Sequence, residues 1–270
     1  MKSMPRRTCL HRLAPGLSAQ AFLPFAARGE ELPRPTAEET AKIGKIAKSF
    51  MEKHEVPGLS VAFSFRDSIA FSTGFGMAGL DKKEEMTPQH LFRIASIAKP
   101  LTAVGIYKLI EQGKLKPEDR IFGKDGLLQV RGMRKLPEGV EDITLHHLLT
   151  HTCGGWQNDG NDPMFRHPDL DHRELIAITL KEQPLKHAPG SNYAYSNFGY
   201  CLLGRVIEKT SDKTYAAFME DDVLAPSGVK DMKISGNTLS DRMKNEVIYY
   251  GRNGEDPYHM NVRRMDAHGG

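Results

Sequence analysis

The sequence predicts an α+β fold, with an antiparallel sheet flanked by helices and followed by a mostly helical part. Two observations support this prediction. A helical pattern over residues 36–51 is followed by two short runs rich in β-forming residues, 59–65 and 68–75. From Ser96 onward, apolar residues recur at helical spacing between loops. A helix followed by a hairpin indicates a sheet with a helix packed on it.

The first helix and the hairpin have clear local signals. Thr36 and Glu39 have the spacing of a capping box, so the helix begins there. A Pro-Gly pair at 57–58 ends it, and an Arg-Asp pair at 66–67 is the expected hairpin turn. The apolar positions of the helix are Ile43, Ile46, Ala47, Phe50 and Met51.

From Ser96 onward, the sequence predicts helices and loops. One apolar helix begins near Ser96 and ends near Gly113, whose conformational freedom suits a helix C-terminus. Thr144 caps a short helix that includes Leu148 and Leu149. Two more helices are expected over 197–209 and 215–224, and a faint strand signal over 246–250.

The charge of the chain excludes a nucleic-acid partner. The 270 residues carry a formal charge of +3, but the first 27 contain four basic residues and no acidic one. The remaining residues contain 33 basic and 34 acidic side chains, so their charges nearly cancel. No basic footprint for nucleic acid is present.

The first 27 residues resemble an export signal. Arg6-Arg7 precedes a moderately apolar stretch over 13–25, and Ala26-Ala27 follows. We therefore expect export to the periplasm or the cell exterior; a disordered tail on a cytoplasmic protein is the alternative. No stretch reaches the roughly 18 apolar residues that a membrane-spanning helix needs.

The remaining sequence divides into a linker and one domain. Residues 28–35 form the linker, and 36–270 the domain. Within the domain we expect a sheet part over 36–95, a mostly helical part over 96–240 and an incomplete C-terminal part over 241–270.

The cysteines and histidines do not form a recognisable metal site. Cys153 and Cys201 could pair, but their spacing fits no disulfide framework, so we expect buried free thiols; no C-x-x-C motif is present. His147 and His151 have a spacing that could chelate a metal, but no third ligand is evident. Helix packing and capping are the expected roles of these histidines, and we expect no cofactor.

The most informative motif is Ser96-Ile97-Ala98-Lys99. At this spacing on a helix, the lysine amine can reach the serine hydroxyl. Serine is a weak nucleophile until a base takes its proton, and a neutral, desolvated lysine can be that base. A second copy, Ser227 to Lys230, lies in an expected turn after Pro226. We interpret this copy as structural.

A second cluster is Tyr195-Ser196-Asn197, at the start of an expected helix beside a glycine-rich turn at Gly190. Side chains at such a position face a cleft more often than a core. A tyrosine there can transfer a proton near a reacting bond, and an asparagine amide can hold a substrate carbonyl.

These motifs, in this order and with the segment 145–155 between them, resemble the serine β-lactamase-related superfamily. Within it, the chain is most similar to the branch of class C β-lactamases, D-alanyl-D-alanine carboxypeptidases and family VIII esterases. The similarity begins near Thr36 and reaches the last residue. The resemblance implies a β-lactamase/transpeptidase-like fold.

The resemblance also implies a reaction. Ser96 would be the nucleophile, with Lys99 as its partner in proton removal and its own backbone N–H as half of the oxyanion hole. Tyr195 would pass a proton to the leaving group, and Asn197 would contact the substrate amide or the lysine. The implied substrate is a small-molecule or peptide acyl compound: a β-lactam, a D-amino-acid peptide or a small ester. A non-catalytic penicillin-binding-like module or an inactive fragment is the alternative.

This chain differs from the family pattern at the third motif. A Lys-Thr-Gly or His-x-Gly normally lies on a sheet strand beside the site. Here only His268-Gly269-Gly270 matches in form, and it lies closer to Tyr195 than is usual in this branch. We therefore expect the C-terminal strands to be missing, which would leave the hairpin over 59–75 with an unpaired edge.

Overall fold

The structure is a computed structural model. It describes residues 34–130, 132–167, 169–236, 238–252 and 255–258. The predicted export signal over 1–27 and the candidate third motif at His268 and Gly270 lie outside these ranges.

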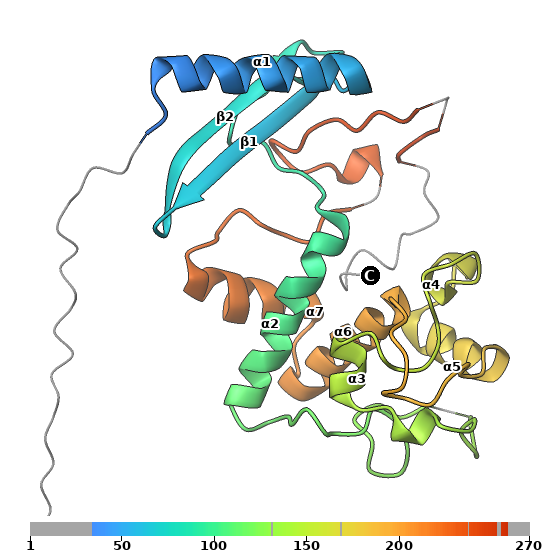
Figure 1. Ribbon diagram of the computed structural model, residues 1–270. Coiled ribbons are helices and arrows are strands. Elements are labelled where there is room, and N and C mark those ends of the chain that lie inside the picture. The colour runs from blue at the N-terminus through green and yellow to red at the C-terminus, as the bar shows by residue number, and fades with distance from the viewer. Residues whose placement is uncertain (1–33, 131, 168, 237, 253–254, 259–270) are drawn as a thin grey trace, which may run out of the picture.

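A three-stranded antiparallel sheet in the order β1-β2-β3 and the helix α1 form the N-terminal region (Figure 1). Helix α1 packs against both β1 and β2. The elements are α1 (Ala37–His54), β1 (Gly58–Phe65), β2 (Ser68–Gly79) and β3 (Glu84–Glu85). We call this region the sheet part.

The predicted start of the first helix and the predicted hairpin turn are both present in this region. Thr36 and Glu39 form the capping box of α1, with both reciprocal hydrogen bonds present. Arg66 and Asp67 both have positive φ, 47° and 60°, which suits a two-residue hairpin turn because its twist matches that of the strands. Strand β2 continues beyond the predicted end, because its last residues pair with β3.

After β3, the regular elements of the described chain are helices joined by loops, and we call this region the helical part. The α-helices are α2 (Ala98–Glu111), α3 (Leu145–Leu149), α4 (Pro163–Arg166), α5 (His172–Glu182), α6 (Asn197–Ser211) and α7 (Tyr215–Phe218). A π-helical stretch, η3 (Met219–Leu224), continues α7, so the predicted helix over 215–224 changes its hydrogen-bonding pattern after Phe218. Short 3-10 turns are η1 (Ala95–Ile97), η2 (Val140–Asp142), η4 (Ala225–Ser227) and η5 (Leu239–Asp241).

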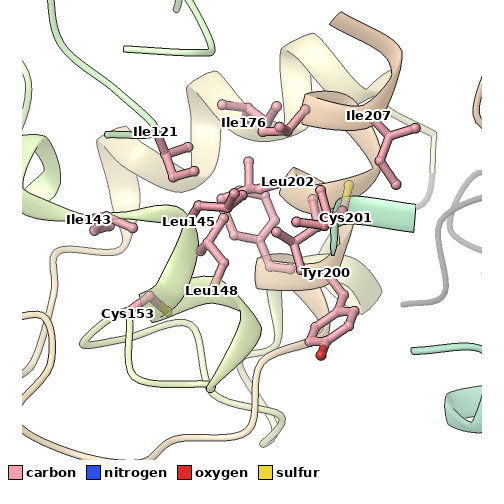
Figure 2. Packing of buried hydrophobic residues seen from close by; sticks show 14 of the residues in the cluster. Ile121, Ile143, Leu145, Leu148, Cys153, Ile176, Tyr200, Cys201, Leu202 and Ile207 are labelled. Carbon is pink, nitrogen blue, oxygen red and sulfur yellow. The ribbon is translucent and has the colours of Figure 1, made fainter. Parts of the chain in front are cut away.

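Helix α6 lies at the centre of the hydrophobic core. Ten of its fifteen residues are buried, and it packs against α2 and α3. Figure 2 shows Leu202 of α6 among side chains such as Leu145 and Leu148 of α3 and Ile176 of α5. Cys153 and Cys201 are free and buried in this core, as predicted, and burial raises the pKa of both thiols.

The sequence interpretation also differs from the structure at two helices and at the faint strand signal. It did not predict α4 or α5, although Asp171 and Glu174 form a capping box at the start of α5. The faint strand signal over 246–250 corresponds to an extended segment with one parallel bridge, between Glu246 and Leu91. The α+β class is confirmed, and no helix among the described residues is long and apolar enough to cross a membrane.

Candidate active site

Ser96 lies in the 3-10 turn η1, which leads directly into α2, and it is exposed. Ala95, just before it, has φ +44°, a left-handed conformation that costs a non-glycine residue conformational energy. Contacts of Arg93 hold the turn. Its backbone N–H donates to the Tyr249 hydroxyl at 2.6 Å, and its guanidinium donates to the Gly236 carbonyl at 2.9 Å.

Lys99 lies in the first turn of α2 and is only 3% exposed. Its Nζ donates to Ser96 Oγ at 3.1 Å and to Asn197 Oδ1 at 2.8 Å. The first contact follows from the i, i+3 spacing on the helix. The second joins α2 to α6 and brings together residues 98 positions apart in the sequence.

The Tyr195-Ser196-Asn197 segment is placed by the start of α6. Ser196 is the N-cap, and its Oγ accepts a hydrogen bond from the Gly199 N–H at 3.0 Å. Tyr195 therefore lies just before the N-terminus of α6, and Asn197 is the first residue of the helix. Lys99 Nζ lies 5.0 Å from the centre of the Tyr195 ring and 5.6 Å from that of Tyr200.

His151 supports the loop that carries Tyr195. Its Nδ1 accepts from the Ser196 N–H at 3.1 Å, and its backbone carbonyl accepts from the Ala194 N–H at 2.8 Å. The His151 and Tyr195 ring centres are 4.4 Å apart. Burial, and to a smaller extent the charge of Lys99, lower the pKa of His151 to about 4. The imidazole is therefore neutral at neutral pH, as an acceptor must be.

His147 has a separate role, because its Nδ1 accepts from the Thr144 N–H and completes the capping box of α3. The predicted capping role is confirmed. Within the described ranges, no cluster of three His, Cys, Asp or Glu side chains could hold a metal ion.

Asp162 is a buried carboxylate beside the motif residues, and the sequence interpretation missed it. Its Oδ2 accepts from Asn197 Nδ2 at 2.9 Å, and its Oδ1 accepts from the Met164 N–H at 2.9 Å, which caps α4. Burial raises its pKa, while the two hydrogen bonds and the charge of Lys99 act in the opposite direction. The available signal was Asp162-Pro163, a residue type favoured at the N-cap followed by proline at the first helical position.

The second S-x-x-K copy has a different environment. Ser227 lies in η4, and its Oγ donates to the Val223 carbonyl at 2.9 Å. Gly228 follows with φ +79°, and Lys230 is exposed. The copy thus forms a local turn, as the sequence interpretation expected.

Comparison with known proteins shows the family to which the chain belongs. The sequence model of the family named Beta-lactamase matches residues 43–267. Penicillin-binding protein 4* of Bacillus subtilis (strain 168) is 30% identical over 204 residues, which cover 73% of this chain and 42% of that protein. Protein flp of Staphylococcus aureus (strain N315) is 25% identical over 225 residues, 83% of this chain and 44% of the relative. The chain thus spans less than half the length of these two relatives.

Solved structures confirm the fold. The octameric penicillin-binding protein homologue from Pyrococcus abyssi superposes with a TM-score of 0.66 at 25% identity, covering 86% of this chain and 55% of that one. A class C β-lactamase from Rhodobacter sphaeroides gives a TM-score of 0.66 at 22% identity, covering 84% and 59%. The second likeness concerns the fold alone. The predicted β-lactamase/transpeptidase-like fold is confirmed, and the chain belongs to the β-lactamase family.

Proposed function

We propose that the protein is a serine hydrolase that works through an acyl-enzyme. The observation that supports this most directly is the contact of the buried Lys99 amine with the exposed Ser96 hydroxyl at 3.1 Å. A nucleophile and a base within hydrogen-bonding reach, with the base oriented by a third group, are the usual arrangement for covalent catalysis. Asn197 is the orienting group, since its oxygen accepts from the same amine.

In the proposed reaction, Lys99 acts as the general base and takes the hydroxyl proton as Ser96 Oγ attacks the substrate carbonyl carbon. The backbone N–H of Ser96 donates to the oxyanion that forms. When the bond to the leaving group breaks, Tyr195 passes a proton to that group, and the acyl chain remains on Oγ as an ester. Water then attacks the ester and releases the acid, which regenerates the serine hydroxyl.

Tyr195 suits this transfer because its ring lies beside the lysine amine, which can replace the proton that the phenol gives up. The proposed substrates are β-lactams, D-amino-acid peptides and small esters, since these carry the acyl group that the reaction requires. The name of one relative, penicillin-binding protein 4*, supports the same chemical class.

A fluorophosphonate probe tests the nucleophile. The wild-type chain should become covalently labelled, and Ser96→Ala should abolish the label because the attacking oxygen is gone. Lys99→Ala should slow labelling by about 10²–10⁴-fold, the usual contribution of a general base. Ser227→Ala is the matched control, because Ser227 also stands in an S-x-x-K sequence but bonds Val223 instead.

Two outcomes would contradict the proposal. Labelling that persists in Ser96→Ala would place the nucleophile elsewhere. Reversible binding of a fluorescent penicillin without a covalent adduct would favour the non-catalytic binding module over the hydrolase.

A further inference from the structure

Three buried polar side chains form a continuous hydrogen-bonded chain behind Ser96. Lys99 of α2 donates to Asn197 of α6, which donates to Asp162 at the start of α4. Residue exposure is 3%, 5% and 1%, respectively. Polar groups this deeply buried need partners of the right kind, because an unpaired one costs free energy.

The amide of Asn197 has two chemically different ends that are nearly identical in shape. Its Nδ2 can only donate and its Oδ1 can only accept, so its orientation depends on its neighbours. Lys99 offers N–H donors on one side, and the Asp162 carboxylate offers only acceptors on the other. One orientation satisfies both neighbours, and the opposite one would oppose donor to donor and acceptor to acceptor.

We propose that Asp162 is a positioning residue that fixes the Asn197 amide with its oxygen toward Lys99. Its role in activating the nucleophile rests on the proposed serine hydrolase. With Asn197 Oδ1 accepting one N–H, the nitrogen lone pair through which Lys99 acts as a base remains available for the Ser96 hydroxyl. With the amide reversed, its NH2 group would compete for that lone pair.

Both oxygens of Asp162 are in use, which makes an isosteric substitution informative. Oδ1 accepts from the Met164 N–H and Oδ2 from Asn197. An asparagine at position 162 has one acceptor only. If it keeps the cap of α4, it turns its NH2 toward Asn197 and forces that amide to reverse. If it keeps the contact with Asn197, it loses the cap.

The first experiment measures the rate of fluorophosphonate labelling against probe concentration. Asp162→Asn should lower the maximal rate by about 10- to 100-fold, the effect of one unsatisfied buried polar group, with little change in the half-saturating concentration. Asp159→Asn is the matched control and should label within about twofold of wild type. It removes the same charge from the same loop, but Asp159 is exposed and bonds the Asn161 N–H and Lys186 instead.

A second variant, Asp162→Ser, separates the loss of the contact with Asn197 from a loss of folding. A serine oxygen can still accept from the Met164 N–H and cap α4, so the variant should fold. It offers Asn197 no carboxylate, so we expect labelling to be slowed here too. Asp162 variants that fold and label like the wild type, while Ser96→Ala does not label, would overturn the positioning role and leave the proposed function intact.

A second experiment does not depend on activity. Asn197→Asp would bring two carboxylates together and should lower the melting temperature. When it is combined with Asp162→Asn, the amide at position 162 faces the carboxylate at position 197, so one amide again faces one carboxylate. The double variant should therefore melt closer to wild type than the sum of the two single shifts. Additive shifts would overturn the inference. A coupled pair in a chain that no probe labels would support the orienting contact and refute the proposed hydrolase.

Discussion

The sheet part and the helical part bury their apolar residues to very different extents. In the helical part, α6 is surrounded by a large cluster of fully buried side chains (Figure 2). In the sheet part, Ile69 is 70% exposed and Phe63 is 49% exposed, and the only buried residue of α1 is Ala47. A hairpin with so little buried surface has little stability of its own.

This difference shows which region fixes the candidate site. Lys99, Asn197 and Asp162 belong to α2, α6 and the start of α4, and all three are buried. Their positions are therefore set by the helical core. The sheet part contributes mainly the segment that leads into the Ser96 turn.

The largest expected effect comes from the same substitution made in each part. Phe198→Ala on α6 removes a fully buried ring that packs edge-on against Trp156, and it should cost about 3–5 kcal/mol of unfolding free energy. Phe63→Ala on β1 should cost under about 1 kcal/mol, since half of that residue is already exposed. Urea denaturation measures both. Equal losses would contradict the comparison.

An intermediate effect is expected from His151 as the pH falls. Its pKa is about 4 in the folded chain, below the ordinary 6.5, so the unfolded chain binds the proton more readily. The contribution of neutral His151 to the free energy of unfolding is therefore fully present above about pH 6.5, and it is lost as the pH falls towards 4. After allowance for partial exposure, the loss is on the order of 2 kcal/mol.

Melting temperatures measured between pH 7 and pH 4 test this expectation. His151→Gln retains an acceptor for the Ser196 N–H but cannot titrate, so its curve should be flatter than that of wild type. Parallel curves for the two proteins would show that the pH dependence arises elsewhere.

The smallest effect is expected at the start of α1. Thr36→Ala removes the side chain that caps this exposed helix and should cost about 1 kcal/mol. Hydrogen exchange should become faster in α1 while α6 keeps its protection, because the two helices belong to different parts. Equally faster exchange in α6 would mean that the two parts unfold together.

Features with local signals could be predicted from the sequence. The capping box at Thr36, the hairpin turn at Arg66-Asp67 and the helix that starts at Asn197 each depend on a few neighbouring residues. The order of S-x-x-K and Tyr-x-Asn also marked residues that the fold brings together.

Two other features that depend on tertiary contacts were not predicted. Asp162 and Asn197 are 35 positions apart, and only the packing of α4 on α6 brings the carboxylate to the amide. The left-handed conformation of Ala95 has no local signal either, since alanine rarely adopts it. It is accompanied by hydrogen bonds from Arg93 to residues far along the chain.

Those hydrogen bonds also impose an order in time during synthesis. The Arg93 N–H finds its partner only when Tyr249 has been added, 156 residues later. A nascent chain that already contains Ser96, Lys99 and Asn197 still lacks this support for the turn before the nucleophile. On the ribosome, the support for the serine is therefore completed late, after the helical core that surrounds its lysine.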